Sequence, residues 1–194
     1  IFVIYMNQKK CKILGLLIFP SAVQLLDRLS PNLMLRHTFH PSILRQYDIR
    51  GTFGETLDSS DAIAIGRSFG TIISLKYGKT ASCAVGLDGR DSSPLLEESL
   101  IEGLKSTGVN IIRVGLGPSP MLYFSVFHLD VDAAVMVTGS HNPKDQNGFK
   151  FMLGKRSYFG SDIELLGEIS ASGEFSSGQG FVEEVSVVDS YVGL

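Results

Sequence analysis

The sequence predicts an α/β fold, a three-layer α/β/α sandwich in which helices cover both faces of a mixed sheet. From about residue 38 onward, short apolar runs alternate with segments of helical periodicity. Strand and helix signals that alternate in this way are typical of layered α/β domains. Many of the 21 glycines cluster between these segments, where the backbone can approach a ligand closely.

Four helices and four buried strands are expected in turn. Ser59-Ser60-Asp61 predicts the N-cap of the first helix, and Gly78 its end. Pro94 opens the second helix, which Gly108 closes. The third helix is expected at about 121–128, and the fourth runs from a Ser161 cap to about residue 169, before a Ser- and Gly-rich loop at 170–180. The expected strands are 81–87, 109–114, 133–137 and 148–153.

The composition limits the functional class. The chain has 194 residues, 44% hydrophobic residues and a net charge of −3, which fits one globular domain with a full core. No basic face is indicated, so nucleic-acid binding is not expected. Cys11 and Cys83 are far apart and lack metal-site spacing, which predicts reduced thiols and a cytoplasmic location.

Residues 1–38 differ in character from the rest of the chain. Lys9, Lys10 and Lys12 precede the apolar run 13–19, as in a signal peptide. That run is far shorter than the ~20 residues of a membrane helix, so no membrane partner is expected. Two interpretations stay open, a working signal or upstream sequence that is not native. The cytosolic character of residues 39–194, the expected domain, favours the second.

The stretch Thr138-Gly-Ser-His-Asn-Pro143 follows a predicted strand and can present Ser140 on an exposed loop. A serine hydroxyl is a weak nucleophile unless its surroundings activate it. Lys150 lies where the chain returns, and a nearby cation favours phosphoryl transfer over acyl transfer because it stabilises the transferring oxygens.

This loop resembles the active-site loop of the α-D-phosphohexomutases, whose serine carries the catalytic phosphate. Tyr47-Asp-Ile-Arg-Gly51 resembles the N-terminal motif of that family, and Gly86–Ser92 resembles its next segment. The resemblance runs from about residue 39 to the C-terminus. Gly139 before Ser140 and Tyr47 at the start of the first motif resemble the phosphomannomutase/phosphoglucomutase branch.

The resemblance implies roles for individual residues. Ser140 is expected to be the phosphoryl carrier, Lys150 to assist proton transfer and Arg50 to lie beside the phosphoserine as a cation. Tyr47, His141 and Asn142 are expected to line or shape the phosphate- and substrate-binding site, although packing is an equal alternative for Tyr47. Asp88 and Arg90 are expected to form a structural pair.

The resemblance also implies an activity, the reversible transfer of phosphate between C6 and C1 of mannose or glucose phosphates. Phosphorylated Ser140 would give its phosphoryl group to the sugar, with a hexose 1,6-bisphosphate as intermediate and Mg²⁺ as cofactor. Family members have four domains, and their Asp-Gly-Asp-Gly-Asp magnesium loop does not occur in this sequence. Ser140, through its phosphate, is therefore the one metal ligand expected here.

The sequence leaves two other functions open. The chain can be a non-catalytic fragment, without the metal-binding and sugar-binding domains, and we expect no turnover from it alone. It can also be a serine hydrolase, but the Gly-x-Ser-x-Gly elbow is missing and no clear His and Asp partners follow from the sequence.

Overall fold

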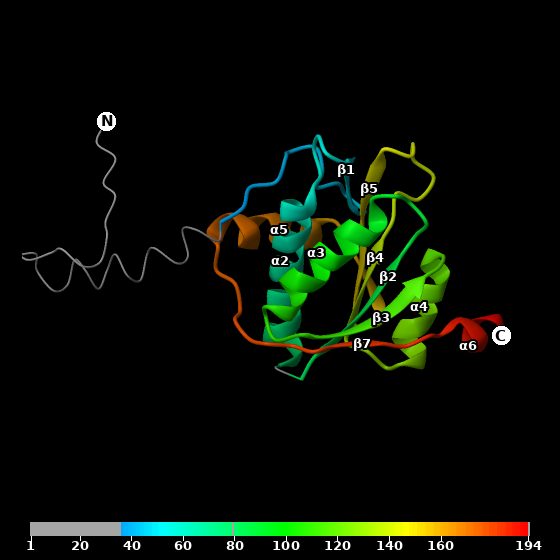
Figure 1. The fold of residues 1–194 in the computed structure, drawn as a ribbon. Helices are drawn as coiled ribbons and strands as arrows, with labels where there is room; N and C mark the ends of the chain where they lie inside the picture. Colours follow the sequence, from blue (N-terminus) through cyan, green and yellow to red (C-terminus); the bar gives the residue numbers. More distant parts are fainter. Residues whose placement is uncertain (1–35, 79, 194) are drawn as a thin grey trace, which may run out of the picture. The chain divides into compact units, whose positions relative to one another are not determined.

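A computed structural model describes residues 36–78 and 80–193 of the chain. It confirms the three-layer α/β/α sandwich on a mixed sheet (Figure 1). The signal-like run at 13–19 and Cys11 lie outside the described residues. No helix among residues 36–78 and 80–193 is long and apolar enough to span a membrane.

The strands are β1 Ile49–Thr52, β2 Ser82–Leu87, β3 Asn110–Leu116, β4 Ala133–Val137, β5 Gln146–Leu153, β6 Arg156–Tyr158 and β7 Val182–Glu184. The helices are α2 Ser59–Tyr77, α3 Ser93–Lys105, α4 Ser119–His128, α5 Ser161–Ser172 and α6 Val188–Val192.

The sheet has the strand order β1-β5-β4-β2-β3-β7, and β6 pairs with β5. Strands β4, β2, β3 and β7 are parallel to one another, whereas β5 is antiparallel to β4, β1 and β6. Helix α3 joins the parallel neighbours β2 and β3, and α4 crosses over from β3 to β4, which pairs with the other side of β2. The carboxyl ends of β2 and β4 therefore lie next to each other at one edge, where open α/β sheets place their ligand sites.

The two faces of the sheet are covered unequally (Figure 1). Helices α2, α3 and α5 pack on one face, where Phe69 and Leu100 contact a core that includes Val135 and Phe149. On the other face α4 packs through Leu122 and Val126, with α6 beside it. Successive strand residues alternate between the two cores because their side chains point to opposite faces.

Helices α2 and α3 touch backbone to backbone at two glycines. A Cβ on Gly66 would overlap the carbonyl oxygen of Leu100, and a Cβ on Gly103 would overlap that of Ile63. Only glycine permits this approach, since any side chain would separate the two helices. The contact fixes the position of α3, and with it the helix start that lies beside the candidate site.

Three predicted helix ends are wrong. Helix α3 ends at Lys105 with Ser106 as its C-cap, before the predicted Gly108. The N-cap of α2 is Asp58 and not Ser59-Ser60-Asp61, because the Asp58 carboxylate accepts from the amides of Ser60 and Asp61 while Asp61 accepts from the Asp58 amide. The N-cap of α5 is Gly160 and not Ser161. Gly78 does end α2, with a φ of 87° that suits glycine.

Residues that precede the predicted domain start at residue 39 already contact the domain. The backbone amide of His37 donates to Ser170 in α5, and its ring Nε2 lies 2.7 Å from a carboxylate oxygen of Asp61. Phe39 is buried in the core of the α2 face. Residues 36–38 therefore pack on α2 and α5, and the exact boundary of the domain stays a prediction.

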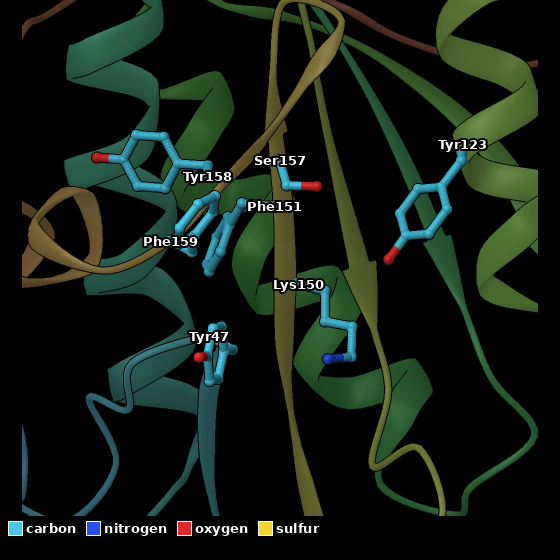
Figure 2. Close-up of a pocket in the computed structure, with 7 residues that line it drawn as sticks. All are labelled: Tyr47, Tyr123, Lys150, Phe151, Ser157, Tyr158 and Phe159. Atoms are coloured by element: carbon cyan, nitrogen blue, oxygen red, sulfur yellow. The ribbon is translucent and has the colours of Figure 1, made fainter.

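A pocket of about 310 Å³ lies between α4, β5 and β6. Figure 2 shows aromatic rings around it and the Lys150 side chain pointing into it. Its lining residues are Tyr47, Tyr123, Lys150, Phe151, Ser157, Tyr158 and Phe159.

Candidate active site

The loop between β4 and β5 is a closed turn that presents Ser140. The amide of Thr138 donates to the carbonyl of Gly148 at 2.9 Å, so the two strands meet where the loop begins. Inside the loop, the amide of Asn142 donates to Gly139 and that of Gln146 to Pro143. Ser140 itself is exposed and has a φ of 55°, a left-handed conformation that is costly for a residue with a Cβ. The out-and-back loop predicted from the sequence is therefore present.

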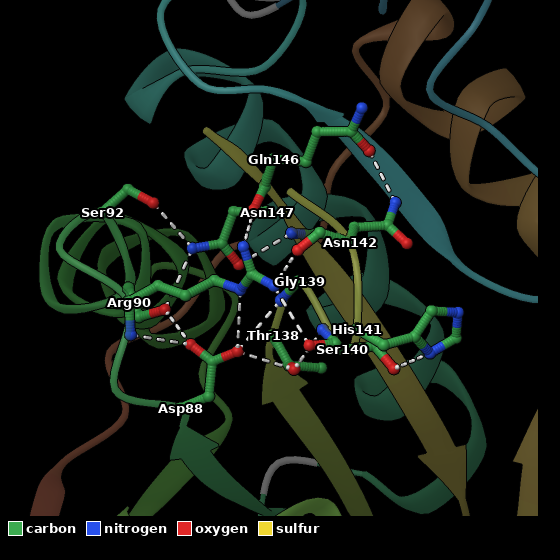
Figure 3. Close-up of polar contacts among 12 residues, drawn as sticks. Asp88, Arg90, Ser92, Thr138, Gly139, Ser140, His141, Asn142, Gln146 and Asn147 are labelled. Atoms are coloured by element: carbon green, nitrogen blue, oxygen red, sulfur yellow. Dashed lines mark hydrogen bonds and ion pairs between the residues drawn. The ribbon is translucent and has the colours of Figure 1, made fainter. Parts of the chain in front are cut away.

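The side chain of Arg90 holds this loop from within. Its Nη1 donates to the carbonyls of Pro143 at 2.6 Å and Gln146 at 2.9 Å, and its Nη2 donates to those of Ser140 at 3.0 Å and Asn142 at 2.7 Å. Figure 3 shows the guanidinium lying among these loop residues. Gly139 is needed here, because a Cβ at that position would overlap the guanidinium.

Asp88, at the end of β2, supports both the loop and Arg90. Its carboxylate accepts from the Thr138 hydroxyl at 2.8 Å and from the Gly139 amide at 3.0 Å. It also pairs with Arg90, whose Nε lies 3.3 Å away, which confirms the predicted structural pair. Burial by itself raises the pKa of Asp88, but hydrogen bonds from Ser93, Thr138 and the amides of Arg90 and Gly139 outweigh it and hold that pKa below the usual value.

Asn147 ties the loop to the start of α3. Its fully buried side-chain amide donates to the hydroxyls of Ser92 at 2.8 Å and Ser93 at 2.9 Å. Its side-chain oxygen accepts from the amide of Gly148. Loop, β2 end and helix start thus form one connected polar network (Figure 3).

Two cations reach the site from β1 and β5. The antiparallel register places Arg50 opposite Gly148, and its continuation places Asp48 opposite Lys150. The Asp48 carboxylate oxygen accepts from Arg50 at 2.6 Å and from Lys150 Nζ at 2.8 Å. Arg50 also donates to the carbonyl of Gly139 at 3.1 Å, although the two residues are far apart in the chain. Arg50 and Asp48 are buried, whereas Lys150 is partly exposed.

The remaining predicted residues lie around these groups. His141 Nδ1 is 3.3 Å from Ser140 Oγ, and Asn142 donates from its side chain to Gln146. Tyr47 is exposed and lines the pocket beside Lys150, with its ring 6.3 Å from that of Phe159.

Within the described chain, the Ser140 hydroxyl hydrogen-bonds to His141 and makes no direct bond to Arg50 or Lys150. Those two side chains meet at Asp48. Their convergence on a phosphate at Ser140 therefore stays a prediction.

The described residues do not provide a magnesium site. They contain no group of three or more His, Cys, Asp or Glu side chains that could hold a metal ion. Asp88, the carboxylate that borders the Ser140 loop, is engaged by four hydrogen-bond donors and by Arg90. Mg²⁺ requires several oxygen ligands, so a phosphate on Ser140 would not hold it alone.

Sequence reasoning missed three members of the site. The role of Arg90 in the loop was hidden because its partners are backbone carbonyls, which carry no residue identity. Asp48 could have been noticed, since Asp48 and Arg50 are two apart in an extended motif and so share one face of a strand. Asn147 lies inside the loop-to-strand string, but its partners come from the start of α3.

Comparison with known proteins agrees with this architecture. The family model described as phosphoglucomutase/phosphomannomutase, alpha/beta/alpha domain I, matches residues 41–171. A phosphomannomutase/phosphoglucomutase of Pseudomonas aeruginosa is 42% identical over 154 residues, which are 79% of this chain and 33% of that protein. A phosphoglucomutase of Neisseria meningitidis serogroup B is 41% identical over 152 residues, 77% of this chain and 33% of that protein.

A solved structure supports the same assignment. The crystal structure of a phosphoglucomutase/phosphomannomutase family protein from Burkholderia thailandensis superposes with a TM-score of 0.76 at 39% identity, covering 80% of this chain and 35% of that one. The chain thus spans about a third of the length of the relatives it matches. It belongs to the phosphoglucomutase/phosphomannomutase family and carries that family's α/β/α domain I.

Proposed function

We propose that this chain is the phosphoserine-bearing domain of a phosphomannomutase/phosphoglucomutase. In this function Ser140 carries the phosphoryl group that is exchanged with mannose or glucose phosphates. The observation that carries the proposal is the placement of Ser140, an exposed nucleophile with a positive φ on a loop tied down by Arg90 and Asp88. Such a loop costs conformational energy, and strained backbone of this kind is concentrated at functional sites.

The chemistry requires a phosphoryl carrier with positive surroundings. When phosphoserine reacts with a sugar hydroxyl, the bond from phosphorus to Ser140 Oγ breaks and a bond from phosphorus to the sugar oxygen forms. The sugar hydroxyl loses its proton and Ser140 Oγ gains one. We assign the assistance of this proton transfer to Lys150, which lies on the strand that follows the loop. Arg50 donates to the carbonyl of Gly139, next to Ser140, and contributes positive charge there.

The proposed cycle passes through a hexose 1,6-bisphosphate and includes Mg²⁺. A bound metal ion would neutralise charge on the transferring group. Its ligands besides the phosphate would have to come from outside the described residues, and so would most contacts to the sugar. We therefore propose that the chain alone does not catalyse the reaction. We also propose that the reaction takes place in the cytoplasm.

Phosphorylation of Ser140 tests the function directly. The full-length protein that contains this domain is incubated with glucose 1,6-bisphosphate and MgCl₂, and intact-mass and tandem mass spectrometry locate any added phosphoryl group. We expect one group, on Ser140, and none in Ser140→Ala. A phosphoryl group on another residue would contradict the assignment.

One observation favours a second function. His141 Nδ1 lies 3.3 Å from Ser140 Oγ, the kind of contact that a serine hydrolase uses. Among the described residues, however, no carboxylate hydrogen-bonds to the His141 ring to orient it. A fluorophosphonate probe distinguishes the two functions, because labelling of Ser140 would support hydrolysis, whereas an unlabelled Ser140 supports phosphoryl transfer.

A further inference from the structure

We infer that Arg90 is the positioning residue of the Ser140 loop, and that its guanidinium binds the loop and not the phosphate. This inference rests on the proposed function for its catalytic meaning, but the contacts that carry it are independent of substrate. Arg90 comes from the segment after β2, whereas three of its carbonyl partners come from the loop after β4 and the fourth, Gln146, is the first residue of β5.

The terminal N–H groups of Arg90 are fully used. A guanidinium has five N–H groups, of which four are on the two terminal nitrogens. Each terminal nitrogen of Arg90 donates to two loop carbonyls, so all four of these N–H groups have a partner. The Nε atom lies 3.3 Å from the Asp88 carboxylate, an ion-pair contact without a hydrogen bond. No terminal N–H is left for a phosphate oxygen, although Arg90 lines the same surface hollow as Ser140.

The shape of the loop follows from this bonding. Four carbonyls that point inward toward one cation cannot be satisfied by one another, since carbonyl oxygens only accept. Arg90 is itself held in place by Asp88, which also fixes Thr138 and Gly139 at the loop entrance. The positive charge of Arg90 also lies directly behind the residue proposed to carry the phosphate, because Nη2 donates to the carbonyl of Ser140.

Lysine cannot replace this group. An ammonium has three donors that spread from one atom, whereas the guanidinium is a planar fork with donors in fixed directions. Arg90→Lys keeps the charge beside Asp88 and so retains the ion pair. It therefore separates the effect of the charge from that of the four-carbonyl geometry.

The first measurement is amide hydrogen exchange of the loop by NMR in the intact chain. The reporting amides belong to Ser140, Asn142 and Gln146, which bond within the loop and not to Arg90. We expect Arg90→Ala and Arg90→Lys to raise their exchange rates by about ten-fold or more, the change for local opening made easier by about 1.4 kcal/mol. Guanidinium ion at millimolar concentration should restore protection in Arg90→Ala.

A matched control is Arg113→Ala. Arg113 is a partly buried arginine that pairs with the buried Glu97 and lies outside the site. Its loss should lower global stability but leave exchange at the three loop amides unchanged. Exchange within about two-fold of wild type in Arg90→Lys would overturn the inference, because it would show that the guanidinium geometry is not needed.

The second measurement separates positioning from phosphate binding. For phosphorylation of Ser140 by glucose 1,6-bisphosphate in the full-length protein, we expect Arg90→Ala to lower the maximal rate by ~10² while the half-saturating concentration stays nearly constant. Guanidinium should recover part of the rate. A rise in the half-saturating concentration at an unchanged maximal rate would show that Arg90 binds the phosphate, and would overturn the inference. A full-length wild-type protein that is not phosphorylated on Ser140 would count against the proposed function, while loop exchange still decides the role of Arg90.

Discussion

Arg90 and Arg50 both donate to carbonyls of the Ser140 loop, yet their surroundings differ. Arg90 binds four carbonyls and is balanced by its own carboxylate, Asp88, so this group is formally neutral. Arg50 binds one carbonyl and shares Asp48 with Lys150, so two positive charges face one negative charge and a net charge of +1 is left. The loop thus receives its shape from one arginine and its positive surroundings from the other.

The largest effect is expected from Lys150→Ala. Loss of the lysine should slow phosphorylation of Ser140 by ~10² or more, because proton transfer by a positioned side chain contributes that much. The loop itself should keep its shape, since the Arg90 contacts do not involve Lys150. Phosphorylation kinetics by mass spectrometry, together with amide exchange at Ser140, would measure both. Faster amide exchange in the loop of this variant would contradict the claim that Arg90 sets the loop conformation while Lys150 supplies only charge and proton transfer.

A smaller effect is expected from Asp48→Asn. The change raises the local charge from +1 to +2 and removes the anchor that holds both cations. We expect inorganic phosphate to bind more tightly while phosphorylation slows by about ten-fold, since each ~1.4 kcal/mol of lost transition-state stabilisation is a factor of ten. Isothermal titration with phosphate and single-turnover kinetics would test this pair of opposite changes. Slower transfer with weaker phosphate binding would instead indicate that the fold is damaged.

The smallest effect is a dependence of stability on pH. The hydrogen bonds to Asp88 hold its pKa in the folded state below its value in the unfolded chain, about 3.9. Asp88 therefore stabilises the fold above that value, and the stabilisation is lost as the pH falls through the lower, folded-state pKa.

Urea denaturation between neutral pH and pH 3 measures this loss. Asp88→Asn should be less stable at neutral pH and lose less stability on acidification than wild type. The pKa of Asp58 is also lowered, chiefly by the hydrogen bond from the Ser60 side chain. Because Asp58 lies away from the Ser140 loop, the acid profile of a variant at Asp58 serves as a comparison. Identical acid profiles for wild type and Asp88→Asn would remove Asp88 from this account.

The sequence predicted most elements that have a strong local pattern. The β4 strand has the predicted bounds, and Pro94 lies in the first turn of α3, which begins one residue earlier at Ser93. Strands β1, β6 and β7 were missed because each has only three or four residues and gains its hydrogen bonds from β5 or β3. The five-residue helix α6 was missed as well. The residues of the Ser140 loop could be named in advance, but not what holds them. Hydrogen bonds to backbone carbonyls, as at Arg90, and cross-strand partners, as at Asp48, depend on register and tertiary placement.

The glycine contact between α2 and α3 makes the site sensitive to a distant change. Gly103 lies ten positions beyond Ser93, about 15 Å along the helix at 1.5 Å per residue. A methyl group at Gly103 would push α3 away from α2 and, because a helix moves as a stiff rod, would displace the hydroxyl that holds Asn147 at its other end. A substitution that contacts no reacting atom would in this way displace the residues that hold the Ser140 loop in position.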